Sequence, residues 1–66
     1  MNWTDIEDIA EALENNYPGF DIISVRFTKL KQMVLELEGF DGDPDKCNER
    51  VLEAIQANWI EIREEQ

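Results

Sequence analysis

The sequence predicts one small, mainly all-α domain, a three-helix, helix-turn-helix-like bundle. Its 66 residues are enough for one hydrophobic core and leave no room for a second, so residues 1–66 form a single domain. Three stretches carry apolar residues at the i, i+3, i+4, i+7 spacing of one helical face, and short connections containing proline or glycine separate them.

The first helix is expected from about Asp5 to about Asn16. Thr4, followed three residues later by Glu7, has the pattern of a capping box. Tyr17-Pro18-Gly19 should end the helix, because proline disfavours helical backbone in the residue before it. One apolar face follows from the spacing: Ile6, Ile9, Ala10 and Leu13.

The next connection should return Phe20 to the core and then form a helical turn or a bend over residues 21–24. Val25-Arg26-Phe27 alternates apolar and polar residues, which predicts a very short strand in a hairpin-like wing.

The second helix should begin after a Thr28 cap and end near Glu38, with Gly39 as its terminator. Its apolar face consists of Leu30, Met33, Val34 and Leu37.

The third helix should follow the loop Phe40–Asp43 directly, with Asp43 as the cap and Pro44 as the first helical residue. Residues 64–66 should fray. The apolar stripe of this helix is Val51, Leu52, Ile55, Trp59 and Ile62.

Large aromatic side chains are numerous for so short a chain, and most of them should form the core. Trp3 precedes the first helix, where it would act as a hydrophobic staple or lie in an interface. The set is Trp3, Tyr17, Phe20, Phe27, Phe40 and Trp59.

The composition excludes several classes of function. With no histidine, and Cys47 as the single cysteine, neither zinc nor haem nor a disulfide is expected, and the chain should not be an enzyme. Cys47 should be a packing or capping residue, because carboxylates around it disfavour the thiolate. No apolar stretch approaches the roughly 20 residues of a membrane span, so a soluble, cytoplasmic protein without a membrane partner is expected.

The net charge of −10 disfavours nucleic acid as a partner, because the acids would repel the phosphate backbone. The charge is also uneven. Residues 1–21 carry six acids and no base, residues 22–35 carry three bases and no acid, and the remainder is acidic again.

The acidic loop, residues 41–45, is the most distinctive segment. It begins like a calcium-binding EF-hand loop, but Lys46 occupies the position that requires glycine and Leu52 the position that requires glutamate. Helix capping, a weak oxygen-only cation site and a docking surface for a basic partner all remain open for this loop. Glu7, Glu11 and Glu14 raise the same question, because like charges at this spacing destabilise a helix unless a solvated face, a cation or a basic partner compensates.

The whole chain resembles the IscX family, the small acidic proteins of the ISC iron-sulfur cluster assembly system. The resemblance runs from the first helix to the third without a gap. It is carried by Trp3-Thr4-Asp5, Ile9, Ala12-Leu13, Tyr17-Pro18, Asp21, Val25-Arg26-Phe27-Thr28, Leu30, Leu37, Phe40-Asp41, Asp43-Pro44, Asn48-Glu49, Leu52-Glu53-Ala54-Ile55 and Trp59.

This resemblance implies a modified winged helix that binds no DNA, modest affinity for Fe²⁺ through oxygen ligands, and docking on a cysteine desulfurase. In that family the docking surface of the desulfurase is shared with frataxin and ferredoxin. The iron ligands implied are Asp5, Asp8, Glu11, Glu38, Asp41 and Asp43. The partner-binding residues implied are Trp3, Asp5, Glu7, Asp8, Glu11, Asp41, Asp43, Asp45 and Glu49.

Three positions depart from the family pattern: Gly42 and Lys29, where acids are usual, and Ile22, where proline is usual. The sequence therefore predicts a monomeric, non-enzymatic adaptor that docks on the desulfurase, modulates it and binds ferrous iron weakly. Two alternatives are an iron donor, and an acidic mimic that occupies a basic nucleic-acid-binding surface of another protein.

Overall fold

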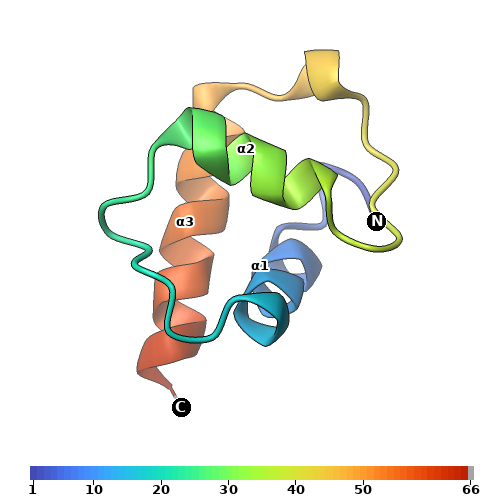
Figure 1. Ribbon diagram of the computed structural model, residues 1–66. Coiled ribbons are helices and arrows are strands. Elements are labelled where there is room, and N and C mark those ends of the chain that lie inside the picture. Colours follow the sequence, from blue (N-terminus) through green and yellow to red (C-terminus); the bar gives the residue numbers. More distant parts are fainter. Residues whose placement is uncertain (66) are drawn as a thin grey trace.

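The computed structural model describes residues 1–65 and confirms the predicted class, because these residues form three α-helices and no strand. The helices are α1 (Ile6–Asn16), α2 (Phe27–Leu35) and α3 (Glu49–Glu64), and a short 3₁₀ helix, η1 (Pro44–Lys46), precedes α3. Figure 1 shows α2 crossing α3, with the N terminus beside the connection that leaves α2 and far from the C terminus. The most extensive contact between helices is that of α1 with α3.

The start of α1 differs from the predicted capping box. Asp5 is the cap residue, and the Thr4 hydroxyl donates instead to Asn2 Oδ1 at 2.6 Å. The Asn2 backbone N–H donates to Asp5 Oδ2 at 2.9 Å, so both polar side chains are engaged in the turn before the helix. The predicted end is confirmed, because Tyr17 is the C-cap and Gly19 adopts a φ of +84°.

The connection between α1 and α2 is a turn without a strand. Residues 22–24 form the turn, in which Val25 N–H donates to the Ile22 carbonyl at 3.4 Å. Phe20 returns to the core as predicted and stacks on Trp59, with ring centroids 5.8 Å apart. The predicted strand over residues 25–27 is wrong because Phe27 is already the first residue of α2.

The bounds of α2 also differ from the prediction. Leu30 N–H donates to the Arg26 carbonyl at 2.9 Å, which makes Arg26 the cap and places Thr28 inside the helix. The helix ends at Leu35, three residues before Glu38. Leu37 nevertheless stays in the core, because its N–H donates to the Val34 carbonyl at 3.1 Å and continues the turn.

The acidic loop does not lead directly into α3. Asp43 does cap a helix that begins at Pro44, accepting from the Asp45 N–H at 2.9 Å, but that helix is only η1. Cys47 and Asn48 then have extended backbone, and Asn48 caps α3 by accepting from the Val51 N–H at 2.9 Å. At the other end Glu64 is the last residue of α3, and Gln66 of the predicted frayed end lies outside the described residues.

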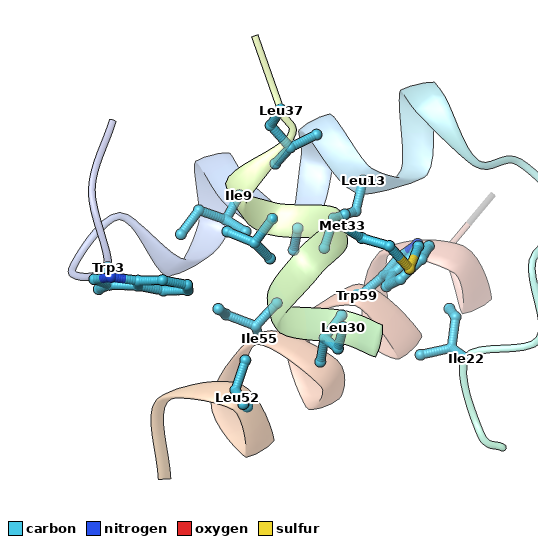
Figure 2. Packing of buried hydrophobic residues seen from close by; sticks show 12 residues of the cluster. Trp3, Ile9, Leu13, Ile22, Leu30, Met33, Leu37, Leu52, Ile55 and Trp59 are labelled. Atoms are coloured by element: carbon cyan, nitrogen blue, oxygen red, sulfur yellow. The ribbon is translucent and has the colours of Figure 1, made fainter. Parts of the chain in front are cut away.

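The core confirms the apolar faces predicted for the three helices (Figure 2). Trp3 and Trp59 are buried, and the other four aromatic side chains are partly buried against the core. Ile6, Val51 and Ile62 lie at the edge of the core. The buried hydrophobic residues are Trp3, Ile9, Ala10, Leu13, Ile22, Leu30, Met33, Val34, Leu37, Leu52, Ile55 and Trp59.

Candidate functional site

The exposed acids form two groups that we treat as the candidate docking surface. The first group, the helix acids, consists of Glu7, Asp8 and Glu11 on α1, all exposed. The second is the acidic loop, residues 41–45, in which all three aspartates are exposed. Within residues 1–65, only Asp41 among these acids has a cationic partner, the amino group of Met1 at 3.4 Å. Both groups are therefore free to act on an external basic surface.

The acidic loop is held in place by the N-terminal residues. Trp3 Nε1 donates to the Asp43 carbonyl at 2.7 Å, and Asp41 N–H donates to the Met1 carbonyl at 2.8 Å. The Trp3 ring packs edge-on against Phe40, with centroids 4.7 Å apart. Trp3 is only 6% exposed. It therefore positions the acidic loop from inside, and its implied role as a direct partner contact does not fit its burial.

Packing explains why glycine occupies position 42, which the sequence alone did not reveal. A Cβ at this position would lie 2.6 Å from Phe40 Cζ and 3.0 Å from Trp3 Cδ1. Since real Cβ atoms do not come so close, the aspartate expected from the resemblance would force Phe40 to move. Glycine at position 42 therefore makes the loop less negative than an aspartate would, and it also allows the loop to pack tightly against the Phe40 and Trp3 rings.

The six implied iron ligands are not gathered into one site. Asp5 is half-buried in the turn before α1, Asp8 and Glu11 are exposed on α1, and the other three lie between α2 and η1. Within residues 1–65, no group of three or more acidic, cysteine or histidine residues is arranged to hold a metal ion. These carboxylates therefore do not fit a preformed iron site, and a cation would meet one or two of them at a time.

Two acids at the C-terminal end of α3, Glu61 in its last turn and the C-cap residue Glu65, extend the group of helix acids. The sequence analysis did not identify these two residues. A hollow of about 220 Å³ is lined by Glu7 and Glu11 of α1, by Asn58, Glu61 and Ile62 of α3, and by Glu65 just after α3. No base lines this hollow. The spacing of Glu61 and Glu65, four residues apart, could have indicated an acidic stripe, but only the packing of α1 on α3 places it beside the helix acids.

Glu14 is the clearest correction, because the sequence analysis grouped it with Glu7 and Glu11 as an acid for a solvated face, a cation or a basic partner. Its side chain is buried, and Oε1 accepts from Trp59 Nε1 at 2.9 Å and from Arg63 Nη2 at 2.8 Å. These hydrogen bonds, the one from Arg63 first, lower the pKa of Glu14 below its usual range. We call Glu14, Trp59 and Arg63 the buried joint.

The buried joint also fixes the connection that follows α1. Arg63 Nη2 donates to the Tyr17 carbonyl at 3.1 Å, and Nη1 donates to the Phe20 carbonyl. Its guanidinium carbon lies 5.6 Å from the centroid of the Trp59 ring, within the range of a cation–π contact. This acid and this base therefore neutralise each other and hold the connection after α1 against α3.

Cys47 is half-buried in the extended segment before α3. Burial raises the pKa of its thiol, and the nearby Lys31 opposes that shift only in part. The neutral thiol is therefore favoured, as expected, although desolvation is the principal cause and not the neighbouring carboxylates.

No helix within residues 1–65 has the length and apolar character needed to span a membrane.

Comparison with known proteins gives two findings that bear on these surfaces. A family model described as iron-sulphur cluster assembly matches residues 1–64. An uncharacterized protein of Pseudomonas aeruginosa is 45% identical over 64 residues, which covers 97% of each chain. Both matches extend over nearly the whole chain, so they take in all three helices and the acidic loop.

Proposed function

The chain belongs to the iron-sulphur cluster assembly family, and from that premise we propose that it is a non-enzymatic adaptor of cluster assembly that docks on a cysteine desulfurase and modulates it. The observation that carries this proposal is the exposed, largely unpaired state of the helix acids and of the acidic loop. The desulfurase comes from the resemblance to IscX, and the proposed cytoplasmic setting is the one expected from the sequence.

Electrostatic attraction suits such an adaptor. Exposed charges act mainly on the rate of encounter, and a chain with a net charge of −10 and few ion pairs among residues 1–65 retains most of its field for a basic partner. The same field would place the adaptor in competition with frataxin and ferredoxin for one basic region of the desulfurase. Competition of this kind modulates the enzyme without any catalytic group on the adaptor.

Ferrous iron is proposed to bind only weakly. The implied ligands are dispersed over α1 and the connection before η1, so binding would rest on one or two carboxylates and on general charge. An iron donor would instead require affinity that survives physiological salt. The double variant Asp41→Asn with Asp43→Asn separates the two proposals: abolition of salt-resistant iron binding in this variant, measured by calorimetry, would favour the iron donor.

Charge reversal on α1 tests the docking proposal. In the variant Glu7→Lys, Asp8→Lys, Glu11→Lys, association with the desulfurase should be slower and less dependent on salt, because exposed charges govern encounter. The matched control Glu36→Lys, Glu38→Lys, Glu53→Lys changes the net charge equally at other exposed positions. Association rates from stopped-flow measurements at low and physiological salt give the comparison.

Two outcomes would contradict this assignment. An unchanged association rate of the α1 variant at low salt would exclude the helix acids as the docking surface. Equal slowing by both triple variants would mean that only the net charge matters and that no particular face docks.

A further inference from the structure

A second surface lies away from the acidic loop, between the connection after α1 and the end of α3. It is an open pocket of about 350 Å³, lined by residues 19–23 and by Ile60, Arg63 and Glu64, mainly through apolar atoms. Figure 1 places this connection on the opposite side of the molecule from the acidic loop. The pocket is therefore available while the acidic loop is occupied.

Ile23 makes this pocket unusual for a surface hollow. Its side chain is 80% exposed, and no other large hydrophobic side chain within residues 1–65 is exposed to a comparable degree. A single exposed apolar residue needs no explanation, but an exposed isoleucine at the edge of an apolar pocket forms a continuous patch. Such patches with a polar rim are typical of interaction sites.

The backbone around Ile23 is fixed, so the patch is preformed. Gln56 Nε2 donates to the Ile22 carbonyl at 2.9 Å, and Arg63 holds the Phe20 carbonyl on the other side of the turn. Ile22 points into the core towards Trp59 (Figure 2), which directs the neighbouring Ile23 outwards. A preformed patch loses little conformational entropy on binding.

The charges at the rim of the pocket indicate the kind of partner. Asp21 and Glu64 are exposed, and neither forms an ion pair within the described residues. The charge of Arg63 is already neutralised by Glu14 at 2.8 Å. The rim is therefore negative over an apolar floor. A second copy of this chain, with its own net charge of −10, would be repelled.

We propose that this pocket binds a basic segment of a partner protein, which inserts one aliphatic or aromatic side chain beside Ile23 and places lysine or arginine next to Asp21 and Glu64. Because this site lies on the opposite side of the molecule from the acidic loop, the protein can hold one partner there and another at the acidic loop. The proposal does not depend on which enzyme the acidic surface docks on.

The test uses the ¹⁵N-labelled full chain and three synthetic peptides of equal length. The first peptide has a central leucine–phenylalanine pair flanked by lysines, the second replaces the pair by two alanines, and the third replaces the lysines by glutamates. We expect amide shifts at residues 19–24 and 60–64 with the first peptide and none there with the other two. Shifts along α1 alone, equal for the first two peptides, would show charge attraction only and would overturn the proposal.

Variants then assign the binding to the patch. Ile23→Ser should weaken the first peptide about tenfold, which corresponds to about 1.4 kcal/mol, without changing the fold because the side chain is exposed. The double variant Asp21→Asn with Glu64→Gln should lower the affinity for the first peptide. Its affinity for a peptide with the same central pair and neutral flanking residues should not change. Ala54→Ser, at another exposed position, is the matched control. Unchanged affinity in Ile23→Ser would overturn the proposal.

A second copy of this chain and a lipid surface are the competing occupants of the pocket. Sedimentation velocity as a function of protein concentration tests the first, and zwitterionic vesicles test the second. A dimer or vesicle complex that disappears in Ile23→Ser would assign the patch to that occupant and overturn the proposal. A protein that remains monomeric, does not bind vesicles and binds the lysine-flanked peptide would support the proposal.

Discussion

Glu11 and Glu14 are three residues apart on α1, and their carboxylates have opposite surroundings. Glu11 is exposed and lines a hollow that contains no base. Glu14 is buried in the joint with Trp59 and Arg63, where it accepts three hydrogen bonds. The same contrast separates the acidic loop, whose aspartates face solvent, from the buried joint.

This contrast shows that an acidic residue in an acid-rich sequence does not necessarily take part in partner binding. A carboxylate stabilises the fold where the chain supplies hydrogen-bond donors for it, and it remains available to partners where the chain supplies none. The four predictions below test this division between the buried joint and the exposed acids.

Trp59→Ala should have the largest effect, because the side chain is completely buried and also donates to Glu14. Replacing a buried tryptophan by alanine costs about 3–5 kcal/mol, a large fraction of the stability of a domain this small. Urea denaturation followed by circular dichroism should show a largely unfolded variant. Cooperative unfolding near the wild-type midpoint would mean that the joint contributes little.

Glu14→Gln should lower the melting temperature, whereas Glu11→Gln on the same helix should leave it unchanged or raise it by relieving repulsion. The matched pair differs only in which carboxylate is lost. Arg63→Met completes a double-mutant cycle, and the double variant should lose less stability than the two single variants added together. Additive losses would show that Glu14 and Arg63 do not act as a pair.

Lowering the pH should remove the difference in melting temperature between the wild type and the variant Glu14→Gln. The pKa of Glu14 is lowered in the folded protein by Arg63 and Trp59, so on acidification the unfolded chain binds this proton first. The contribution of Glu14 is therefore complete above the ordinary glutamate pKa, about 4.3, and is lost as the pH falls through the lower folded value. Thermal unfolding from neutral pH downwards should show converging melting temperatures; a constant difference would contradict this assignment.

Trp3→Phe should have the smallest effect on stability and a local effect on the acidic loop. The variant keeps a ring against Phe40 but removes the hydrogen bond from Nε1 to the Asp43 carbonyl. We expect a loss of about 1 kcal/mol and faster hydrogen exchange at the Asp41 amide, with unchanged exchange around Trp59. Unaltered exchange at Asp41 would show that Trp3 does not hold the loop.

The sequence predicted the three helices and their buried faces because the spacing of apolar residues is a local property. Ile9 and Leu13 on α1, and Ile55 and Trp59 on α3, are buried as expected. The strand at Val25 failed because three alternating residues are too few to distinguish a strand from the start of a helix.

The roles of individual polar residues were harder to predict. Thr4 failed as a cap because α1 begins at Ile6 and Asp5 occupies the cap position. Glu14 was misplaced because its partner, Arg63, lies 49 positions away, and no periodicity relates the two. The exposed state of the helix acids follows from the local pattern, but the dispersal of the implied iron ligands depends on the path of the chain between α2 and η1.

The position of the buried joint also determines when the fold can form during synthesis. Glu14 lies 45 positions from Trp59 and 49 from Arg63, so the joint is a contact of high sequence separation in an otherwise helical protein. Until Arg63 has left the ribosome, the apolar face of α1 has no α3 to cover it. A chain that has not yet gained α3 would therefore leave its first helix unprotected, and apolar surface exposed in this way is prone to aggregate.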